Sequence, residues 1–124
     1  MLGESNRLLD REREALISTA VAAAEGMPVC VGTSHAGTYA TMGLSQMAQE
    51  LGAAAVMVTP SKEGVPLADP RMFEYYANVA EGINIPIVLQ DHPASTLVNM
   101  SVPLLAKLAN DRAKQIGGGC RGLT

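Results

Sequence analysis

Three apolar stretches of the 124-residue chain each end in a short run of polar side chains. In the third, "IPIVLQDHP", the apolar run passes from Leu89 directly to Gln90, Asp91 and His92, with no Gly or Ser between them. An amide such as that of Gln90 can orient a substrate group or a water molecule. Gln90 and Asp91 are therefore candidate catalytic residues facing a pocket. Such residues also end strands as ordinary turn residues, and that alternative stays open.

The other two polar runs occupy residues 32–35, "GTSH", and residues 59–62, "TPSK". His35 and His92 have no third ligand at a spacing typical of metal sites, so a metal is not expected. The two cysteines, Cys30 and Cys120, form neither a metal-binding spacing nor a disulfide framework. No segment indicates a cofactor, and we predict none.

Each polar run lies between an apolar stretch and a helical pattern, so the elements that position it repeat along the chain. The helical patterns that end before the next apolar stretch end at a glycine, as is typical of helix ends, and most begin at a residue that can cap a helix. The aromatic residues of "MFEYYANV" lie at helical spacing and predict core packing and surface cover. The expected helices begin at a cap at Asp10 and stop at Gly26, run from Thr38 to Gly52, begin at Asp69–Pro70 and stop at Gly82, and begin at a cap at Ser101.

Strands made of nearly continuous apolar residues are covered on both faces, and strands that alternate with helices are joined in parallel. The sequence therefore predicts an α/β fold. In parallel α/β folds, ligands bind beyond the carboxyl ends of the strands. We expect the three polar runs to converge around one site, with the segment "MLGES" at the start resembling a fourth strand end.

Composition excludes several classes of partner. The net charge is −3, from 9 basic and 12 acidic residues with no cluster of either sign, and aromatic residues make up 3%. Nucleic acids and anionic membranes require a concentrated basic surface, so we expect neither as a partner. No stretch approaches the roughly 18 apolar residues of a membrane span, and no signal peptide is recognisable. A reduced, cytoplasmic location fits best.

Five segments in order carry a family resemblance: "LGES" with "LLDREREALI", "PVCVGTS", "LGAAAVMVTPS", "FEYYANVAEGINIPIVLQDHPAST" and "MSVPLLAKLAN". Together they resemble the dihydrodipicolinate synthase and N-acetylneuraminate lyase family, from Met1 to about Ile116. The resemblance implies a partial (β/α)8 TIM barrel with about three complete βα units and the end of a preceding strand. It also implies class I aldolase or lyase chemistry, through a Schiff base between a lysine and a 2-keto acid such as pyruvate, usually in a homotetramer.

The resemblance also assigns roles to individual residues. Gly3 and Glu4 correspond to the surviving part of a Gly-Thr-Thr-Gly-Glu run that binds the carboxylate of the keto acid. Ser61 and Lys62 stand where the synthases carry two tyrosines, and we assign them to substrate binding. Gln90 replaces a proton-relaying tyrosine, and Asp91 stands where relatives often have Asn.

These replacements predict the branch of the family. A phenol can relay a proton, whereas the amide of Gln90 can only orient a group. This argues against lysine biosynthesis and sialic acid cleavage. The pattern "QD.PAS" is instead similar to the branch that includes 2-keto-3-deoxyarabonate dehydratase and other sugar-acid enzymes.

The end of the chain departs from the family pattern. An imine requires a desolvated, neutral lysine, and the family places it on the sixth strand, shortly after the position of Ile116. The chain reads "GGGCRGLT" there, which has almost no β propensity. We therefore predict a lyase domain over residues 1–116, a disordered or aberrant tail over 117–124, and a lyase fragment that is inactive alone. Two alternatives are an autonomous α/β module that binds a small anion, and an assembly partner of a full-length relative.

Overall fold

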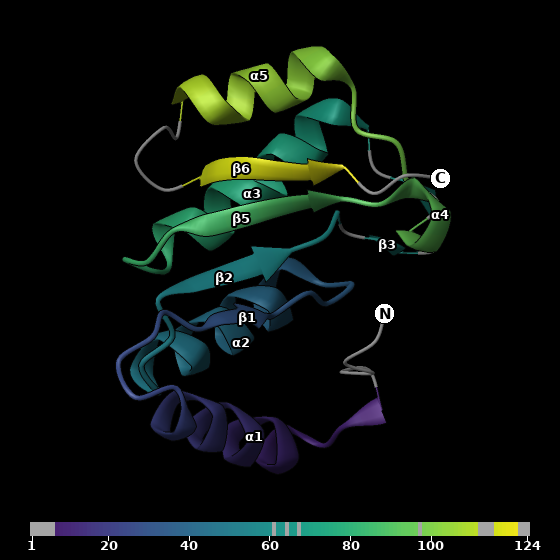
Figure 1. Cartoon of the computed structure of the whole chain (residues 1–124). Helices are drawn as coiled ribbons and strands as arrows, with labels where there is room; N and C mark the ends of the chain where they lie inside the picture. Colours follow the sequence, from purple (N-terminus) through teal and green to yellow (C-terminus); the bar gives the residue numbers. More distant parts are fainter. Residues whose placement is uncertain are drawn as a thin grey trace.

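The computed structural model describes residues 7–60, 62–63, 65–66, 68–96, 98–111 and 116–121. In chain order the elements are α1 (Asp10–Ala23), β1 (Cys30–Gly32), α2 (Thr38–Glu50), β2 (Ala55–Val58), β3 (Lys62–Glu63), β4 (Val65–Pro66), α3 (Asp69–Glu81), β5 (Ile87–Asp91), α4 (Pro93–Thr96), α5 (Val102–Asp111) and β6 (Ile116–Arg121). Four of the strands form one sheet in the order β1-β2-β5-β6 (Figure 1). The short strands β3 and β4 form a separate antiparallel pair.

All three pairings within the four-stranded sheet are parallel. The register aligns Val31 with Val56 and Val56 with Ile87. The order of the strands across this sheet is also their order along the chain. Helices connect the strands, as parallel pairing requires. The predicted α/β class, with parallel strands alternating with helices, is confirmed.

The two faces of the sheet differ in what covers them. Figure 1 shows α2 and α3 behind the sheet, with α1 and α5 at its two ends. The side chains that point toward these helices are nearly inaccessible to solvent: Val56, Val58, Ile87 and Leu89 are at most 4% exposed. The opposite face has no described helix over it, and we call it the open face. By strand alternation and register it carries Cys30, Ala55, Met57, Val88 and Gln90, which are exposed or half-buried.

Three predicted helix caps can be compared with the structure. Ser101 is a cap as predicted, because its Oγ accepts a hydrogen bond from the Leu104 N–H at 3.2 Å. The cap predicted at Asp10 is wrong by one residue, since the cap position is Leu9 and Asp10 lies in the first turn. Glu12 accounts for the shift, because its Oε2 accepts the Leu9 N–H at 2.8 Å and so satisfies the helix start without Asp10.

The cap predicted at Asp69 is also one residue late. α3 starts at Asp69 and its cap position is Ala68, with Pro70 in the first turn. The predicted stop at Gly52 is confirmed: its φ is +99°, a conformation that glycine adopts without steric cost. α1 ends at Ala23, three residues before the glycine that was predicted to stop it.

The tail over residues 117–124 was predicted to be disordered or aberrant. Ile116–Arg121 forms β6 and pairs in parallel with β5, with one register shift between Val88 and Gln90, so residues 117–121 are part of a strand, and the alternative of an aberrant sequence stays a prediction. The ladder joins backbone N–H and C=O groups, which every residue here supplies regardless of its side chain. Low β propensity therefore did not prevent pairing at the edge of β5. Residues 122–124 lie outside the described residues.

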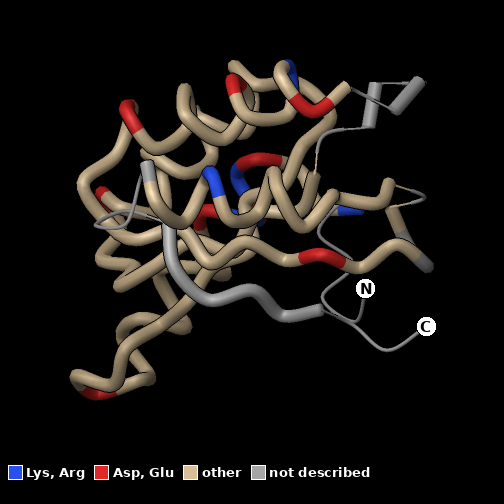
Figure 2. Tube along the Cα trace, turned by 90° about the horizontal axis from the view of Figure 1, so that it is seen from above, with Lys and Arg blue, Asp and Glu red and all other residues tan. Residues whose placement is uncertain are grey.

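Charged residues do not gather on one surface of the described chain. Figure 2 shows Lys and Arg segments interspersed with Asp and Glu segments along the helices. Over the residues that the structure describes, none of the helices has both the length and the apolar character needed to cross a bilayer.

Candidate functional site at the strand ends

The carboxyl ends of β1 and β2 are joined by hydrogen bonds. The backbone N–H of Thr59, the residue after β2, donates to Ser34 Oγ at 2.9 Å. The backbone N–H of Thr33 donates to the carbonyl of Met57 at 3.1 Å, so the ladder continues one step beyond β1. Because β5 runs parallel to β2, its end at Gln90 and Asp91 lies at the same edge of the sheet. The structure therefore brings the three polar runs to one edge.

The two candidate catalytic residues of β5 point to opposite faces of the sheet. Gln90 is half-buried and shares the open face with Met57 and Val88. Asp91 is 3% exposed and lies on the helix side with Ile87 and Leu89. The amide of Gln90 therefore faces the open side of the sheet, while the carboxylate of Asp91 faces the core.

A buried polar network under the strand ends fixes the segment that follows β1. Thr33 Oγ1 and Ser45 Oγ are 2.8 Å apart, which ties the end of β1 to α2. Thr41 Oγ1 is 2.9 Å from the hydroxyl of Tyr75 on α3 and accepts the His35 N–H at 3.1 Å. The loop after β1 is thus held from two neighbouring helices.

Tyr75 and Tyr76 are both buried, with their rings 5.1 Å apart in an edge-to-face arrangement. The Tyr76 hydroxyl donates to the carbonyl of Val58, the last residue of β2, at 3.2 Å. Burial raises the pKa of Tyr76 well above its ordinary value, with smaller contributions in the same direction from Tyr75 and Asp91. Burial also raises the pKa of Tyr75 to about 12, against the lowering effect of its hydrogen bond to Thr41. Both phenols are therefore neutral near pH 7 and act here as hydrogen-bonding groups.

Several predicted site residues cannot be placed at the strand ends. Gly3, Glu4 and Ser61 lie outside the described residues. Lys62 is placed by its backbone alone, in β3, directly beyond the end of β2. Their predicted roles stay predictions. Across the residues that the structure describes, no three His, Cys, Asp or Glu side chains lie close enough together to hold a metal ion.

Sequence reasoning missed the polar network. It assigned the tyrosines of α3 to packing and surface cover, and it did not single out Thr41 or Ser45. Tyr75 and Tyr76 are in the core, but their hydroxyls also hold the loops of the site. A signal was available, since the hydroxyl of a buried tyrosine usually finds a hydrogen-bond partner. The sequence could not identify that partner, because Thr41 and Tyr75 are 34 positions apart.

Residues 2–119 match the model of the Dihydrodipicolinate synthetase family. The chain belongs to this family. It is 40% identical over 111 residues to L-2-keto-3-deoxyarabonate dehydratase of Azospirillum brasilense, a match that covers 87% of this chain and 36% of that enzyme.

Solved structures of the dihydrodipicolinate synthetase family share the fold. The dihydrodipicolinate synthase of Aquifex aeolicus superposes with a TM-score of 0.83 at 32% identity, covering 88% of this chain and 37% of that structure. A prophage protein of the family from E. coli K12, solved in complex with pyruvate, gives a TM-score of 0.84 at 28% identity and covers 94% and 40%. The chain therefore spans less than half the length of these relatives. It matches part of their TIM barrel, as the resemblance predicted.

Proposed function

We propose that this chain supplies part of the substrate site of a Schiff-base lyase that acts on 2-keto acids of the sugar-acid type. Membership of the family supports the reaction class. The 40% identity to a 2-keto-3-deoxy sugar-acid dehydratase supports the substrate class, and the pyruvate complex of a relative supports 2-keto acid recognition. The observation that carries the proposal is the convergence of three polar strand ends at one edge, with Gln90 on the open face.

In this proposal Gln90 orients the substrate or a water molecule, because an amide can donate and accept hydrogen bonds but cannot relay a proton at neutral pH. Asp91 was predicted to be catalytic, and its burial beside Tyr76 supports an indirect role in holding the end of β5. Gly3 and Glu4 bind the carboxylate of the keto acid, while Ser61 and Lys62 contact the rest of the substrate.

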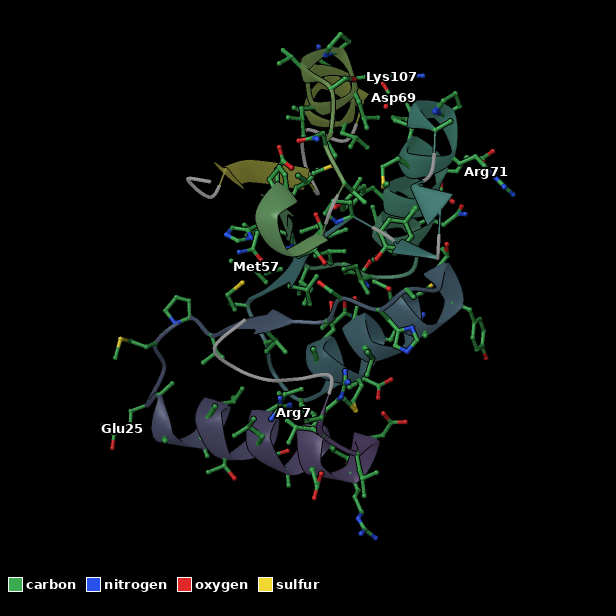
Figure 3. All side chains as sticks on the ribbon, turned by 90° about the vertical axis from the view of Figure 1, so that its right-hand side faces the viewer. Arg7, Glu25, Met57, Asp69, Arg71 and Lys107 are labelled. Atoms are coloured by element: carbon green, nitrogen blue, oxygen red, sulfur yellow. The ribbon has the colours of Figure 1, made fainter. Side chains whose placement is uncertain are left out.

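We further propose that the 124 residues form no imine on their own. The chain contains three lysines, Lys62, Lys107 and Lys114, and β6 reads "IGGGCR" at the position where the family pattern places the reactive amine. Lys107 Nζ lies 4.4 Å from the ring centroid of Phe73, in a cation–π contact within the helix layer. Figure 3 shows Lys107 near Asp69 and well away from Met57 on the open face.

Borohydride trapping tests whether any lysine of this chain forms an imine with pyruvate. The chain is incubated with pyruvate and sodium borohydride and its intact mass is measured, with a full-length dehydratase of the family as the positive control. We expect no mass increase for this chain. The matched variants Lys62→Arg and Lys107→Arg identify the lysine if an adduct forms. An adduct that disappears in Lys62→Arg alone would assign the imine to Lys62 and overturn this part of the proposal.

Recognition without covalent chemistry is tested separately by NMR on the isotope-labelled chain. Titration with pyruvate is expected to shift the side-chain amide of Gln90 and the backbone amide of Thr59, which lie at the strand ends. Asn78, exposed on α3, serves as the internal control and should not shift. Equal shifts with propionate would indicate carboxylate binding without keto-acid recognition. Shifts confined to α1 or α5 would contradict the site.

A further inference from the structure

The side-chain hydroxyl of Thr59 has no hydrogen-bond partner among the described residues. Thr59 directly follows β2 and is 8% exposed, and its backbone N–H, but not its hydroxyl, is bonded to Ser34. The other buried Ser and Thr hydroxyls of the described chain are bonded within the fold: Thr33 with Ser45, Thr41 with Tyr75, and Thr96 with the Val98 carbonyl. Buried polar groups are nearly always paired, so an unpaired hydroxyl at a strand end indicates a group that binds a ligand.

This hydroxyl reaches solvent although the residue is buried. Thr59 Oγ1 is not among the described side-chain atoms that lack both solvent contact and a hydrogen-bond partner, so part of the small exposed area of Thr59 belongs to the hydroxyl. The rest of the residue is enclosed and its backbone is bonded, which holds the hydroxyl in place. A rigidly held polar group that a small molecule can contact is typical of ligand sites.

Thr59 lies beside Gln90 at the edge of the sheet. Val58 and Leu89 are register partners and both point to the helix side, so the residues that follow them are neighbours on the open face. Neighbouring strands are about 4.8 Å apart, a distance that one ligand can bridge. Ser34 Oγ accepts the Thr59 N–H at 2.9 Å and keeps its own O–H as a donor. The ends of β1, β2 and β5 (Figure 1) therefore carry a row of polar groups, which we call the polar row: Ser34, Thr59 and Gln90.

The chemistry of the polar row favours a ligand hydroxyl over a carboxylate. Ser and Thr hydroxyls and the Gln amide each donate and accept hydrogen bonds, as an alcohol does. A carboxylate only accepts hydrogen bonds, so it would leave the acceptor oxygens of the row without donors. The row is therefore suited to the hydroxyl groups of a sugar acid.

We propose that Thr59 selects 2-keto acids that carry a hydroxyl group on their carbon chain, with Ser34 and Gln90 binding the same hydroxyl or the next one. This inference rests on the proposed function, because it assigns a specificity-determining residue to the same site. Thr59 takes no part in covalent chemistry. A 2-keto acid without the hydroxyl displaces water from Thr59 and leaves its side chain unpaired, which weakens binding.

Two five-carbon acids that differ only in hydroxylation test this selection. The Kd of each is measured by NMR titration of the isotope-labelled chain, with 4,5-dihydroxy-2-ketopentanoate as one probe and 2-ketopentanoate as the other. The dihydroxy acid is expected to bind about tenfold more tightly, as one net hydrogen bond allows. Equal Kd values, with the Gln90 amide shifted by both acids, would overturn the selection and leave the proposed function intact. Binding of neither acid would overturn both.

Thr59→Val keeps the shape of the side chain and removes its hydroxyl. This variant should bind the dihydroxy acid about tenfold more weakly without weaker binding of 2-ketopentanoate, whereas Thr59→Ser should retain the wild-type preference. Thr19→Val is the matched control and should change neither Kd, because Thr19 is exposed on α1 and its hydroxyl donates to the Ala15 carbonyl. An equal loss of affinity for both acids in Thr59→Val would show that Thr59 supports the site without recognising a hydroxyl, contrary to the proposal.

Urea unfolding tests the unpaired hydroxyl without any ligand. Thr59→Val should keep the urea midpoint of the wild type or raise it, because no internal hydrogen bond is lost. Thr33→Val is the comparison, because Thr33 is also buried and its Oγ1 lies 2.8 Å from Ser45 Oγ, and its midpoint should fall. Equal falls in the two variants would show that the Thr59 hydroxyl is bonded within the fold, and the proposal would be wrong.

Discussion

Replacing Tyr75 with Phe removes one hydroxyl from the network beneath the strand ends. The side chain is 1% exposed, its hydroxyl is 2.9 Å from Thr41 Oγ1, and it also donates to the carbonyl of His35 at 3.4 Å. The variant keeps the ring and its contact with Tyr76. At pH 7 it should lower the free energy of unfolding by about 1 kcal/mol, the net value of one buried hydrogen bond.

The stronger prediction concerns alkaline pH. The pKa of Tyr75 is raised by burial from 10 to about 12, so folding favours the protonated phenol. The stability that this residue contributes is complete below pH 10, the pKa of the unfolded chain, and is lost as the pH rises toward and through 12. At pH 11 the unfolded phenol is mostly ionised and the folded one is not, which lowers the free energy of unfolding by about 1.4 kcal/mol relative to pH 7. Tyr76 contributes in the same direction.

Tyr75→Phe should therefore be less stable than the wild type at pH 7 but should lose about 1.4 kcal/mol less between pH 7 and pH 11. Urea unfolding followed by circular dichroism at pH 7, 9, 10 and 11 measures this difference, with the protein concentration held fixed. Tyr39→Phe is the control, because Tyr39 is 86% exposed, and it should retain the wild-type pH dependence. If Tyr75→Phe loses as much stability as the wild type over this range, Tyr75 does not titrate as a buried group and the network is not formed as described.

Two further substitutions test the backbone that carries the site. Gly52→Ala should lower the free energy of unfolding by about 1–2 kcal/mol, because φ is +99° there and the new Cβ would lie 3.2 Å from Val21 Cγ1. Gly43→Ala, inside α2 with open space around it, should raise the free energy of unfolding by about 0.5–1 kcal/mol. Urea unfolding of both variants measures the difference. Ser34→Ala should cost about 0.5–1.5 kcal/mol and speed hydrogen exchange at the Thr59 amide, which donates to Ser34 Oγ, while unchanged exchange would show that the β1 and β2 ends are not coupled.

Much of the fold follows from local sequence rules. Apolar runs of strand length between helical patterns predicted a parallel sheet, and the pairing of β1, β2 and β5 confirms it. Helix starts were predicted to within one residue. The errors at Asp10 and Asp69 have different causes: at Asp69 the cap position is Ala68, and the Asp69 carboxylate instead accepts a hydrogen bond from Ser101 Oγ at 2.6 Å. At Asp10 the choice was made by Glu12, whose carboxylate reaches back to the Leu9 N–H.

The site was less predictable, because its geometry depends on the face of each strand. Gln90 and Asp91 are adjacent in sequence, and sequence reasoning treated them as one candidate pair. Strand alternation separates them, so that one faces the open side and the other the core beside Tyr76. Which of the two side chains points toward the helices depends on how β5 pairs with β2, whose residues are about 30 positions away in the sequence. No local pattern contains that information.

The contacts that hold the ends of β1 and β2 do not involve β6, the strand on which the family pattern places the reactive lysine. The loop after β1 is held from the helix side, through Thr41 and Tyr75, and the Ser34–Thr59 contact joins the ends of β1 and β2. None of these contacts involves the open face, so they do not require a closed barrel. β6 lies beside Gln90, with Cys120 as its partner in the register, and its sequence contains no lysine. In the proposed function, substrate orientation and imine formation would therefore depend on different parts of the fold: orientation would use the strand ends that α2 and α3 hold in place, whereas imine formation would require an amine, and β6 contains no lysine.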